Sequence, residues 1–382
     1  MDQRFRVTAS NARPETDVRP THYALAGSGS EPEPVQPHRL QLLRGKWQRF
    51  RAHPLHTAAN RARAIEQTLQ YFCRRAYRKV GFRWPIYHVS WWFLNRVPRK
   101  AYAEESARMQ LSAVQQRVLN HVSTRGIFVC NFNELFPNRS FGKLQQLAEA
   151  HLQESENQKL IQQIREGKLS YLGTKYYLVR LFGNPPIFEQ TDKFVDLCLS
   201  DEILRLVCSY MGMFSRIVDI DLWCNVATEG PDRGSQRWHR DPDDRKLVKL
   251  FLYLRDVDQS TGPFCYIPGT QNGGPSARIY PQTMPDSRYP REGDVEKSFS
   301  EDQILRCTGK AGTLILCNTT GFHKGGHPEK GMRLLFTATY TTNAGPLDNV
   351  VRYTVVGGEK ERLSPAAGYA IGHVVGRKPV RL

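Results

Sequence analysis

The chain has 382 residues, of which 40% are apolar and 24% charged, a composition typical of a soluble globular protein with a sizeable core. No apolar run approaches the roughly 20 residues that a membrane-spanning helix needs. The first residues also lack the apolar core of a secretory signal. We therefore expect a cytoplasmic protein. The formal net charge of +17 is concentrated in residues 39–100, which carry +14 from 15 Lys/Arg and one acid, Glu66, and leave +3 for the rest of the chain.

Composition divides the chain into three parts. Residues 1–38 are rich in Pro, Gly, Ser and charge, which predicts a disordered N-terminal tail. Residues 39–108 are predicted to form a basic helical extension that contains many aromatic residues, with one basic helix over 57–80. Residues 109–382 contain the remaining predicted helices and strands, and we expect them to form the main domain.

The basic extension has three interpretations. Its Lys/Arg residues are interleaved with Trp, Tyr and Phe, which suits peripheral docking of residues 39–100 on an anionic membrane surface. Nucleic acid would also suit this composition, but the extension contains no known nucleic-acid-binding motif. In the third interpretation the aromatic side chains pack on the main domain and the basic residues are solvated.

The predicted elements of the main domain begin with helices and end with strands. Apolar spacing predicts helices over 111–122 and 141–153, strands over 126–132 and 176–182, and helical structure over 192–212 that breaks near Ser200, a potential cap. After Gly212 the pattern is almost entirely that of strands, which we expect at 216–228, 246–257, 262–269, 312–320, 333–342 and 349–356. This order favours an α+β fold with a β-sandwich or barrel.

Two of these strands have contrasting faces. In 246–257 the side chains of Val248, Leu250, Leu252 and Leu254 alternate with those of Lys249, Phe251, Tyr253 and Arg255. In 216–228 an apolar face alternates with Asp221, Trp223 and Asn225. A mixed polar and aromatic face suits the lining of a pocket, although an ordinary solvated sheet face has the same pattern.

The eight cysteines form no C-x-x-C pair, which disfavours a zinc ribbon or a redox motif. Several of them lie inside apolar runs, so we expect buried free thiols.

Three residues have the spacing of a metal site. His239 and Asp241 are two positions apart, so both side chains point to the same side of an extended segment. His323 follows the predicted strand 312–320, 82 positions after Asp241. Two imidazoles and one carboxylate occupy one face of a six-coordinate iron(II) and leave the opposite face open. Arg333 comes ten residues after His323 and could pair with the distal carboxylate of 2-oxoglutarate.

These segments resemble the phytanoyl-CoA dioxygenase-like family of iron(II)- and 2-oxoglutarate-dependent oxygenases. The resemblance rests on WHRDPDD, DVDQSTGPFCYIPGT, GTLILCNTTGFHKGG and Arg333, and it extends over residues 110–345. It implies a double-stranded β-helix core (jelly-roll, cupin-like) with the N-terminal helices packed outside. It also implies a dioxygenase that uses iron(II), O2 and the co-substrate 2-oxoglutarate, with His239, Asp241 and His323 as metal ligands.

Two positions depart from the family pattern. Gln271 stands where the family often has a histidine, but that histidine is not a metal ligand. Gly325 stands where a small hydroxyl residue often helps to bind the co-substrate. Asn225, Tyr253 and Thr320 are candidates to supply the missing hydrogen bond.

The resemblance favours hydroxylation of an unactivated C–H bond in a small-molecule or lipid-like substrate, with release of succinate and CO2. Asp241 disfavours halogenation, because halogenating relatives have Ala or Gly at that position. Desaturation, epoxidation or ring formation, and a non-catalytic binding role, remain alternatives. A cupin-like metalloenzyme that does not use 2-oxoglutarate would have no need of Arg333. The substrate and the oligomeric state stay open.

His327 is a second candidate for the third ligand, but the two glycines before it predict a turn away from the strand. We expect Asp243 and Asp244, which follow Pro242, to form a solvated loop pair.

About forty residues rich in Gly, Pro and charge lie between Gly269 and Gly312. Long irregular insertions are often lids or binding loops, and a plain surface excursion is the alternative. We expect this insertion to border the site and to contribute Arg278, Tyr280 or Arg288.

Overall fold

The computed structural model describes residues 86–168, 177–183, 185–281, 289–345, 353–356 and 363–372. Its helices are α3 (Ile86–Leu94), α4 (Arg96–Ser106), α5 (Ala113–Arg125), α6 (Phe132–Leu135), α7 (Phe141–Gln153), α8 (Ser155–Arg165), α9 (Lys193–Cys198), α10 (Asp201–Met211), α11 (Asp294–Ser298) and α12 (Pro365–Ile371). Its strands are β1 (Ile127–Asn131), β2 (Leu178–Arg180), β3 (Ile187–Glu189), β4 (Arg216–Val226), β5 (Leu247–Tyr253), β6 (Phe264–Tyr266), β7 (Leu305–Cys307), β8 (Thr313–Cys317), β9 (His323–Gly325), β10 (Met332–Thr341) and β11 (Thr354–Val356).

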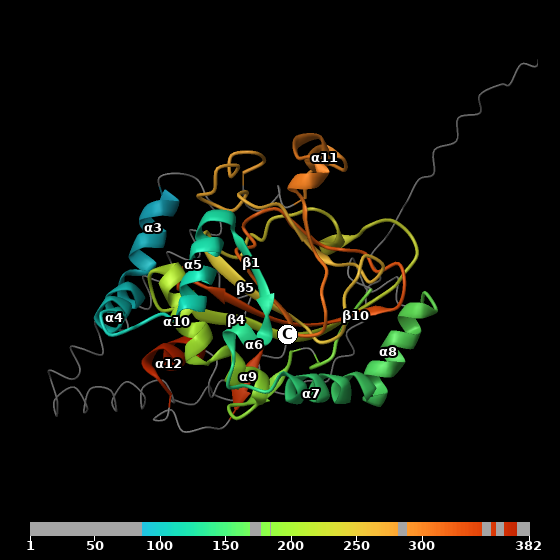
Figure 1. Cartoon of the computed structure of the whole chain (residues 1–382), viewed down its shortest axis with the longest axis horizontal. Coiled ribbons are helices and arrows are strands. Elements are labelled where there is room, and N and C mark those ends of the chain that lie inside the picture. The colour runs from blue at the N-terminus through green and yellow to red at the C-terminus, as the bar shows by residue number, and fades with distance from the viewer. Residues whose placement is uncertain are drawn as a thin grey trace, which may run out of the picture. The chain divides into compact units, whose positions relative to one another are not determined.

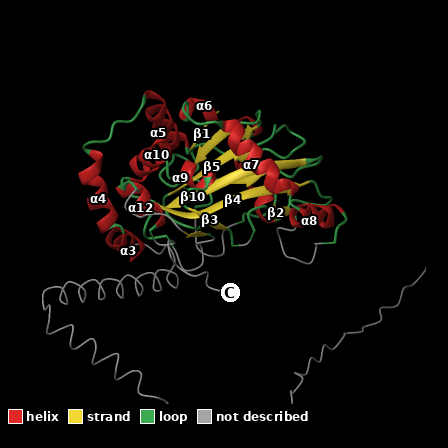
Figure 2. Cartoon of the chain, turned by 90° about the horizontal axis from the view of Figure 1, so that it is seen from below, coloured by secondary structure: helices red, strands yellow, loops and turns green. Residues whose placement is uncertain are grey.

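Two antiparallel sheets form the centre of the fold. The major sheet has the strand order β1-β8-β5-β10-β4-β2, and the minor sheet has the order β7-β6-β9. A separate pair, β11 and β3, is parallel. Figure 2 shows the strands of the major sheet side by side, with helices around them. In Figure 1, α7 and α9 lie below the sheet, while α11 lies at the opposite end of the molecule.

The alternation of side chains decides which layer each face of the major sheet contacts. On β5, Leu250 and Leu252 belong to the large apolar core shared with the helices. Phe251 and Tyr253 point to the other side and pack with Phe264 of the minor sheet. The fold is therefore a double-stranded β-helix with helices packed outside it, and the predicted fold class is confirmed.

Most of the expected elements are present. Helix α7 covers 141–153, as predicted, and helical structure in 192–212 breaks at Ser200 into α9 and α10. Ser200 occupies the N-cap position, but its side chain makes no capping hydrogen bond. The elements that the sequence patterns did not predict include α3, α4, α6, α8, α11, α12 and the three-residue strands β3, β7 and β9. The predicted tail 1–38 and the helix 57–80 lie outside the described residues, and only β11 is described within the strand expected at 349–356.

Helices α3 and α4 are attached to the sheet through a buried carboxylate. Asp244 is fully buried and accepts hydrogen bonds from the indole of Trp91 (3.1 Å), from both the backbone N–H and the hydroxyl of Thr342 (2.8 and 2.6 Å), and from the N–H of Arg245. The expectation of a solvated Asp243–Asp244 pair is therefore wrong for Asp244. From sequence alone, an aspartate in a proline-containing surface loop cannot be told from a buried one. The hydrogen-bond donors from Trp91 and Thr342 come from distant segments of the chain.

Replacement of Asp244 by alanine should lower the free energy of unfolding by about 3 kcal/mol or more, because several buried donors would lose their acceptor. Denaturant titration measures this change. The matched control is Asp201→Ala on the exposed start of α10, where the lost ion pair with Arg205 is worth about 0.5 kcal/mol. Equal effects of the two substitutions would contradict the anchoring role of Asp244.

In the described ranges, no helix is both long and apolar enough to cross a membrane. The seven described cysteines are all free and buried, as expected, while Cys73 lies outside these ranges.

Candidate functional site

Backbone pairing brings the two ends of the predicted metal site together. The N–H of His239 donates to the carbonyl of His323 (3.0 Å), and the N–H of His323 donates back to the carbonyl of His239 (3.1 Å). Two residues on, the N–H of Asp241 donates to the carbonyl of Thr319 (2.8 Å). His323 opens β9, which pairs with β6 of the minor sheet. The backbone therefore fixes the spacing of all three side chains.

The three predicted metal ligands form one buried cluster of side chains, the metal cluster. One ligand atom from each of His239, Asp241 and His323 lies within 4.8 Å of the other two. Nε2 of His239 is 3.8 Å from Oδ1 of Asp241, and Nε2 of His323 is 3.6 Å from Oδ2. The three residues are buried, with exposed fractions of 5%, 8% and 4%. Two imidazoles and one carboxylate at this spacing fit a single iron(II) ion.

Second hydrogen bonds set the orientation of both imidazoles. Nδ1 of His239 lies 2.8 Å from the carbonyl of Arg237, and Nδ1 of His323 lies 2.9 Å from the carbonyl of Gly321. A carbonyl oxygen only accepts, so Nδ1 carries the proton in both rings. Nε2 is then the lone-pair atom that faces Asp241, the arrangement found for histidines that bind metals.

Burial and charge favour the protonation states that bind metal. Burial, reinforced by His323, lowers the pKa of His239 to about 3, and burial also lowers the pKa of His323. Burial alone would raise the pKa of Asp241, but the Lys249 ammonium and the two histidines hold that pKa well below its usual value. At neutral pH the cluster therefore presents two neutral imidazoles and one carboxylate, which are the ligand forms that a divalent metal requires.

Lys249 reaches the metal cluster from the inner face of β5. Its Nζ lies 2.6 Å from Oδ2 of Asp241, and its side chain is 15% exposed. The carboxylates of Asp243 and Asp219 also raise the pKa of Lys249, although burial opposes them. The sequence placed Lys249 on a possible pocket face, but it did not indicate that this cation pairs with a predicted metal ligand.

Arg333 and Asn225 lie opposite each other on neighbouring strands of the major sheet. They are register partners between β10 and β4, and their exposed fractions are 3% and 4%. Nε and Nη1 of Arg333 and Nδ2 of Asn225 have no hydrogen-bond partner among the described residues. Burying a guanidinium without an acceptor costs free energy, so this pair fits the binding of an anionic group such as a carboxylate.

The glycine that departs from the family pattern lies directly beside this guanidinium. A Cβ atom at Gly325 would be 3.1 Å from Nη2 of Arg333, so a larger side chain would displace the arginine. Tyr177 and Ser235 complete the surroundings: their hydroxyls are 2.8 Å apart, and Tyr177 interacts electrostatically with Arg333. Neither residue was singled out from the sequence, because no local pattern links them to β10.

The other two hydroxyl candidates already have backbone partners. The Tyr253 hydroxyl donates to the carbonyl of Cys307 (2.8 Å) and accepts from the N–H of Phe264 (3.1 Å). The Thr320 hydroxyl accepts from the N–H of Asn272 (2.9 Å). Asn225 is therefore the candidate whose polar group remains available beside Arg333.

His327 lies outside the metal cluster. Its Nε2 is 2.6 Å from the carbonyl of Thr228, and its Nδ1 is 3.3 Å from the carboxylate of Asp232. Its imidazole is therefore bonded away from His239 and Asp241, and His323 stays the predicted third ligand.

The insertion contributes one aromatic ring to the metal cluster. The ring of Tyr289 lies 5.5 Å from that of His239, measured between centroids. Arg278 and Tyr280, two of the expected contributors, are exposed, and Arg288 lies outside the described residues. Arg240, between the two ligands, donates to the carbonyls of Thr320 (2.6 Å) and of Ile279 in the insertion (3.0 Å). The insertion is thus attached to the metal-binding segment.

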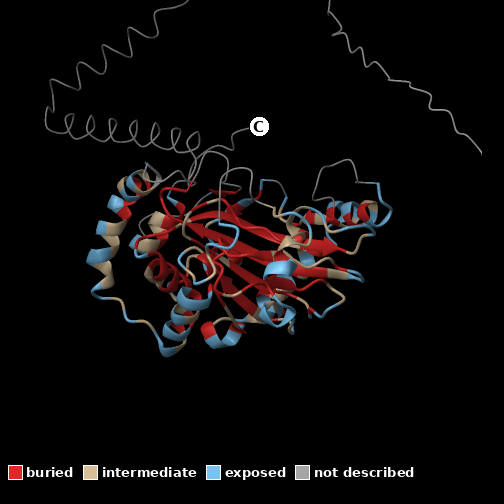
Figure 3. Ribbon diagram, turned by 90° about the horizontal axis from the view of Figure 1, so that it is seen from above, coloured by how far each residue is buried: buried red, intermediate tan, exposed pale blue. Residues whose placement is uncertain are grey.

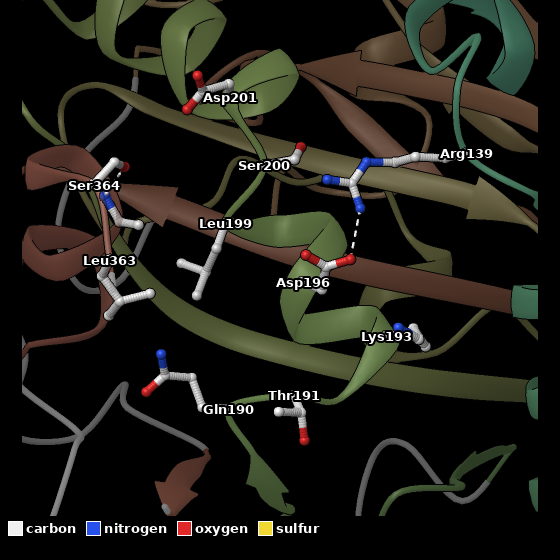
Figure 4. A pocket seen from close by; sticks show the side chains of 11 residues that line it. Arg139, Gln190, Thr191, Lys193, Asp196, Leu199, Ser200, Asp201, Leu363 and Ser364 are labelled. Atoms are coloured by element: carbon white, nitrogen blue, oxygen red, sulfur yellow. Dashed lines mark hydrogen bonds and ion pairs between the residues drawn. The ribbon is translucent and has the colours of Figure 1, made fainter. Parts of the chain in front are cut away.

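A cavity of about 500 Å³ lies elsewhere, on the outer side of the fold, between α9, α10 and α12. Figure 4 shows the pair formed by Arg139 and Asp196 at its wall, joined at 2.7 Å. The cavity contains none of the predicted site residues.

Comparison with known proteins finds one matching family. The family described as phytanoyl-CoA dioxygenase (PhyH) matches residues 195–328, a segment that contains all three clustered ligands and ends five residues before Arg333. No curated protein matches the chain significantly.

Solved structures with similar folds include the epimerase SnoN in complex with Fe3+, alpha ketoglutarate and nogalamycin RO, at 13% identity and a TM-score of 0.40 over 60% of this chain and 84% of that one. EctD from S. alaskensis, with 2-oxoglutarate and 5-hydroxyectoine, is 15% identical, with a TM-score of 0.40 over 67% and 82%. The carbocyclase SnoK from nogalamycin biosynthesis is 16% identical, with a TM-score of 0.39 over 67% and 92%. Residues 195–328, about a third of the chain, match the phytanoyl-CoA dioxygenase family and contain the buried cluster of His239, Asp241 and His323. This match indicates a 2-oxoglutarate-dependent dioxygenase whose cofactors are iron(II), 2-oxoglutarate and O2.

Proposed function

We propose that the chain hydroxylates a C–H bond of a small-molecule substrate, with conversion of 2-oxoglutarate and O2 to succinate and CO2. His239, Asp241 and His323 would hold the iron, and Arg333 and Asn225 would bind the distal carboxylate of 2-oxoglutarate. When bound, iron(II) supplies the activation of O2 coupled to oxidation of the 2-oxo acid. Desaturation, epoxidation and ring closure use the same cofactors and remain alternative outcomes.

The observation that carries this proposal is the buried guanidinium of Arg333. A metal-binding jelly roll without a 2-oxo acid co-substrate has no use for a cation that is 3% exposed and lacks an acceptor at Nε and Nη1. A carboxylate accepts two parallel N–H bonds from such a fork. The amide of Asn225, its register partner, offers a further donor for the same carboxylate.

The chain's own residues perform three tasks in this proposal. The backbone bonds between His239 and His323 hold the ligands in place before any substrate arrives. Lys249 keeps Asp241 ionised and oriented through the contact at Oδ2. The apolar inner core around Phe251 limits the access of water to the site.

The inner face beside Lys249 favours a polar substrate. Asp219 shares this face, because both residues are register partners of Thr339. Arg180 of β2 pairs with Asp219 at 3.4 Å and with Asp221. A charged wall of this kind can hydrogen bond to hydroxyl or amino groups, and it offers an acyl chain little apolar surface. We therefore favour a polar small molecule over a lipid-like one.

Anaerobic reconstitution with iron(II) and 2-oxoglutarate tests the proposal directly. The wild-type protein should develop a weak visible metal-to-ligand charge-transfer band, because the 2-oxo acid chelates the metal on the face left open by the protein ligands. His323→Ala should abolish the band, since it removes one of three ligands. His327→Ala is the matched control and should keep it, because His327 bonds to Thr228 and Asp232 instead.

Absence of the band from folded, iron-loaded wild-type protein would overturn the proposed use of 2-oxoglutarate. If His327→Ala loses the band and His323→Ala keeps it, the third iron ligand is His327 and not His323.

A further inference from the structure

The outward side of α3 and α4 exposes large apolar side chains close together. Val89 is 67% exposed, Trp92 60% and Val97 49%. These are three of the nine exposed large apolar side chains in the described residues, and they lie within nine consecutive positions. Exposed apolar residues that gather in this way mark interaction surfaces, whereas single ones are ordinary.

The opposite side of the same helices is fixed to the main domain. Trp91 and Leu94 are 7% and 1% exposed and belong to the large apolar core. The amide of Asn95 donates to the Thr342 hydroxyl (3.1 Å), and the amide of Asn343 donates to the carbonyl of Leu94 (2.6 Å). Trp92 therefore cannot turn inward, because its neighbour Trp91 already occupies the buried side. In Figure 3 these helices, found at the left by their place in Figure 1, show exposed residues on their outer side.

Basic residues flank the exposed apolar side chains. Helical hydrogen bonds continue across the junction of α3 and α4, from Asn95 to Trp91 (3.2 Å) and from Arg99 to Asn95 (3.1 Å). Within α3, positions 89, 92 and 93 share one side, and within α4, positions 96, 97 and 100 share one side. The Arg96 guanidinium lies 4.8 Å from the centre of the Phe93 ring. Residues 67–103 contain eight Lys/Arg and no Asp or Glu.

We propose that the outward side of these helices, the α3–α4 face, docks the protein peripherally on an anionic phospholipid surface. The α3–α4 face is formed by Val89, Trp92, Phe93, Arg96, Val97 and Lys100. Tryptophan prefers the membrane–water interface, and bases close to it attract acidic headgroups. The helices have nine and eleven residues, so they lie on the bilayer and do not cross it. A nucleic-acid site would place cations and polar groups at its centre, whereas this face has Trp and Val there. The α3–α4 face is separate from the metal cluster, so docking on a membrane does not depend on which reaction the site catalyses.

Co-sedimentation of the full-length protein with lipid vesicles tests this surface. The vesicles contain phosphatidylcholine alone or with phosphatidylserine. The wild-type protein should bind the anionic vesicles at least tenfold more strongly than the neutral ones, and less strongly as salt rises. Val89→Ser combined with Trp92→Ser should reduce partitioning at least tenfold. Arg96→Glu combined with Lys100→Glu should reduce it on the anionic vesicles. The matched control is Ile187→Ser, which removes an equally exposed apolar side chain (58%) from β3 and should leave binding unchanged.

Three results would overturn the proposal. In the first, the protein does not bind anionic vesicles, or the serine pair binds as well as the wild type. In the second, a DNA or RNA oligonucleotide binds to this face and vesicles do not. In the third, acrylamide fails to quench Trp92 fluorescence in the absence of vesicles. The Trp92 signal is obtained as the difference between the wild type and Trp92→Phe. This result would mean that another part of the chain covers the α3–α4 face. Circular dichroism of each variant establishes that the fold is intact.

Discussion

Replacement of Arg333 by methionine is expected to weaken the binding of 2-oxoglutarate by 100-fold or more. Each hydrogen bond to a charged group contributes about 1.5–3 kcal/mol, and Nε and Nη1 of Arg333 could donate two of them. Methionine keeps most of the buried volume, so the change isolates the lost charge. Titration of the anaerobic iron(II) protein with 2-oxoglutarate, followed by the charge-transfer band, gives the dissociation constant.

The control is Arg255→Met, which removes an arginine that pairs with Glu149 at 2.5 Å on a partly exposed surface. It should leave the affinity for 2-oxoglutarate unchanged. Iron affinity, measured without the co-substrate, should be similar in both variants, because neither arginine belongs to the metal cluster. A dissociation constant in Arg333→Met within threefold of the wild-type value would rule out Arg333 as the carboxylate-binding residue.

Lys249→Met is expected to destabilise the metal-free protein and to make its stability depend strongly on metal. Removing one partner of a buried ion pair costs about 3–5 kcal/mol, because the other charge stays buried. In a protein of this size that corresponds to a fall in Tm of about 4–6 °C. A divalent ion would replace the lost positive charge beside Asp241, so saturating iron(II) or cobalt(II) should raise the Tm of the variant more than that of the wild type.

Differential scanning fluorimetry with and without metal measures both effects. The matched control is Lys310→Met, which breaks an exposed pair with Asp256 and should change stability by less than about 1 kcal/mol. An equal rise in Tm on metal addition for Lys249→Met and the wild type would show that Lys249 does not compensate the charge of Asp241.

The parts of the fold and site that could be predicted from sequence are those with a short-range pattern. Alternation along 246–257 predicted that Leu250 and Lys249 lie on opposite faces, and in the structure Leu250 joins the large apolar core while Lys249 reaches Asp241. The i, i+2 spacing of His239 and Asp241 and the strand before His323 predicted a cluster that the structure brings together.

The features that could not be predicted depend on contacts between distant segments. Asp244 follows a proline in a polar stretch, and only the approach of Trp91 and Thr342 makes it a buried acceptor. Tyr177 reaches Arg333 from a segment more than 150 positions earlier. Helix α12 has only seven residues, too few to show a clear helical period.

The paired backbone bonds between His239 and His323 have a consequence for metal choice. They fix the distance between the imidazoles whether or not an ion is present, so the site has little freedom to adapt its geometry to one metal. For nitrogen and oxygen donors, affinity generally rises from manganese and iron through cobalt and nickel, which both bind more tightly than iron(II). Cobalt and nickel should therefore displace iron(II) as competitive inhibitors. The identity of the bound ion would then follow the cellular supply of metals.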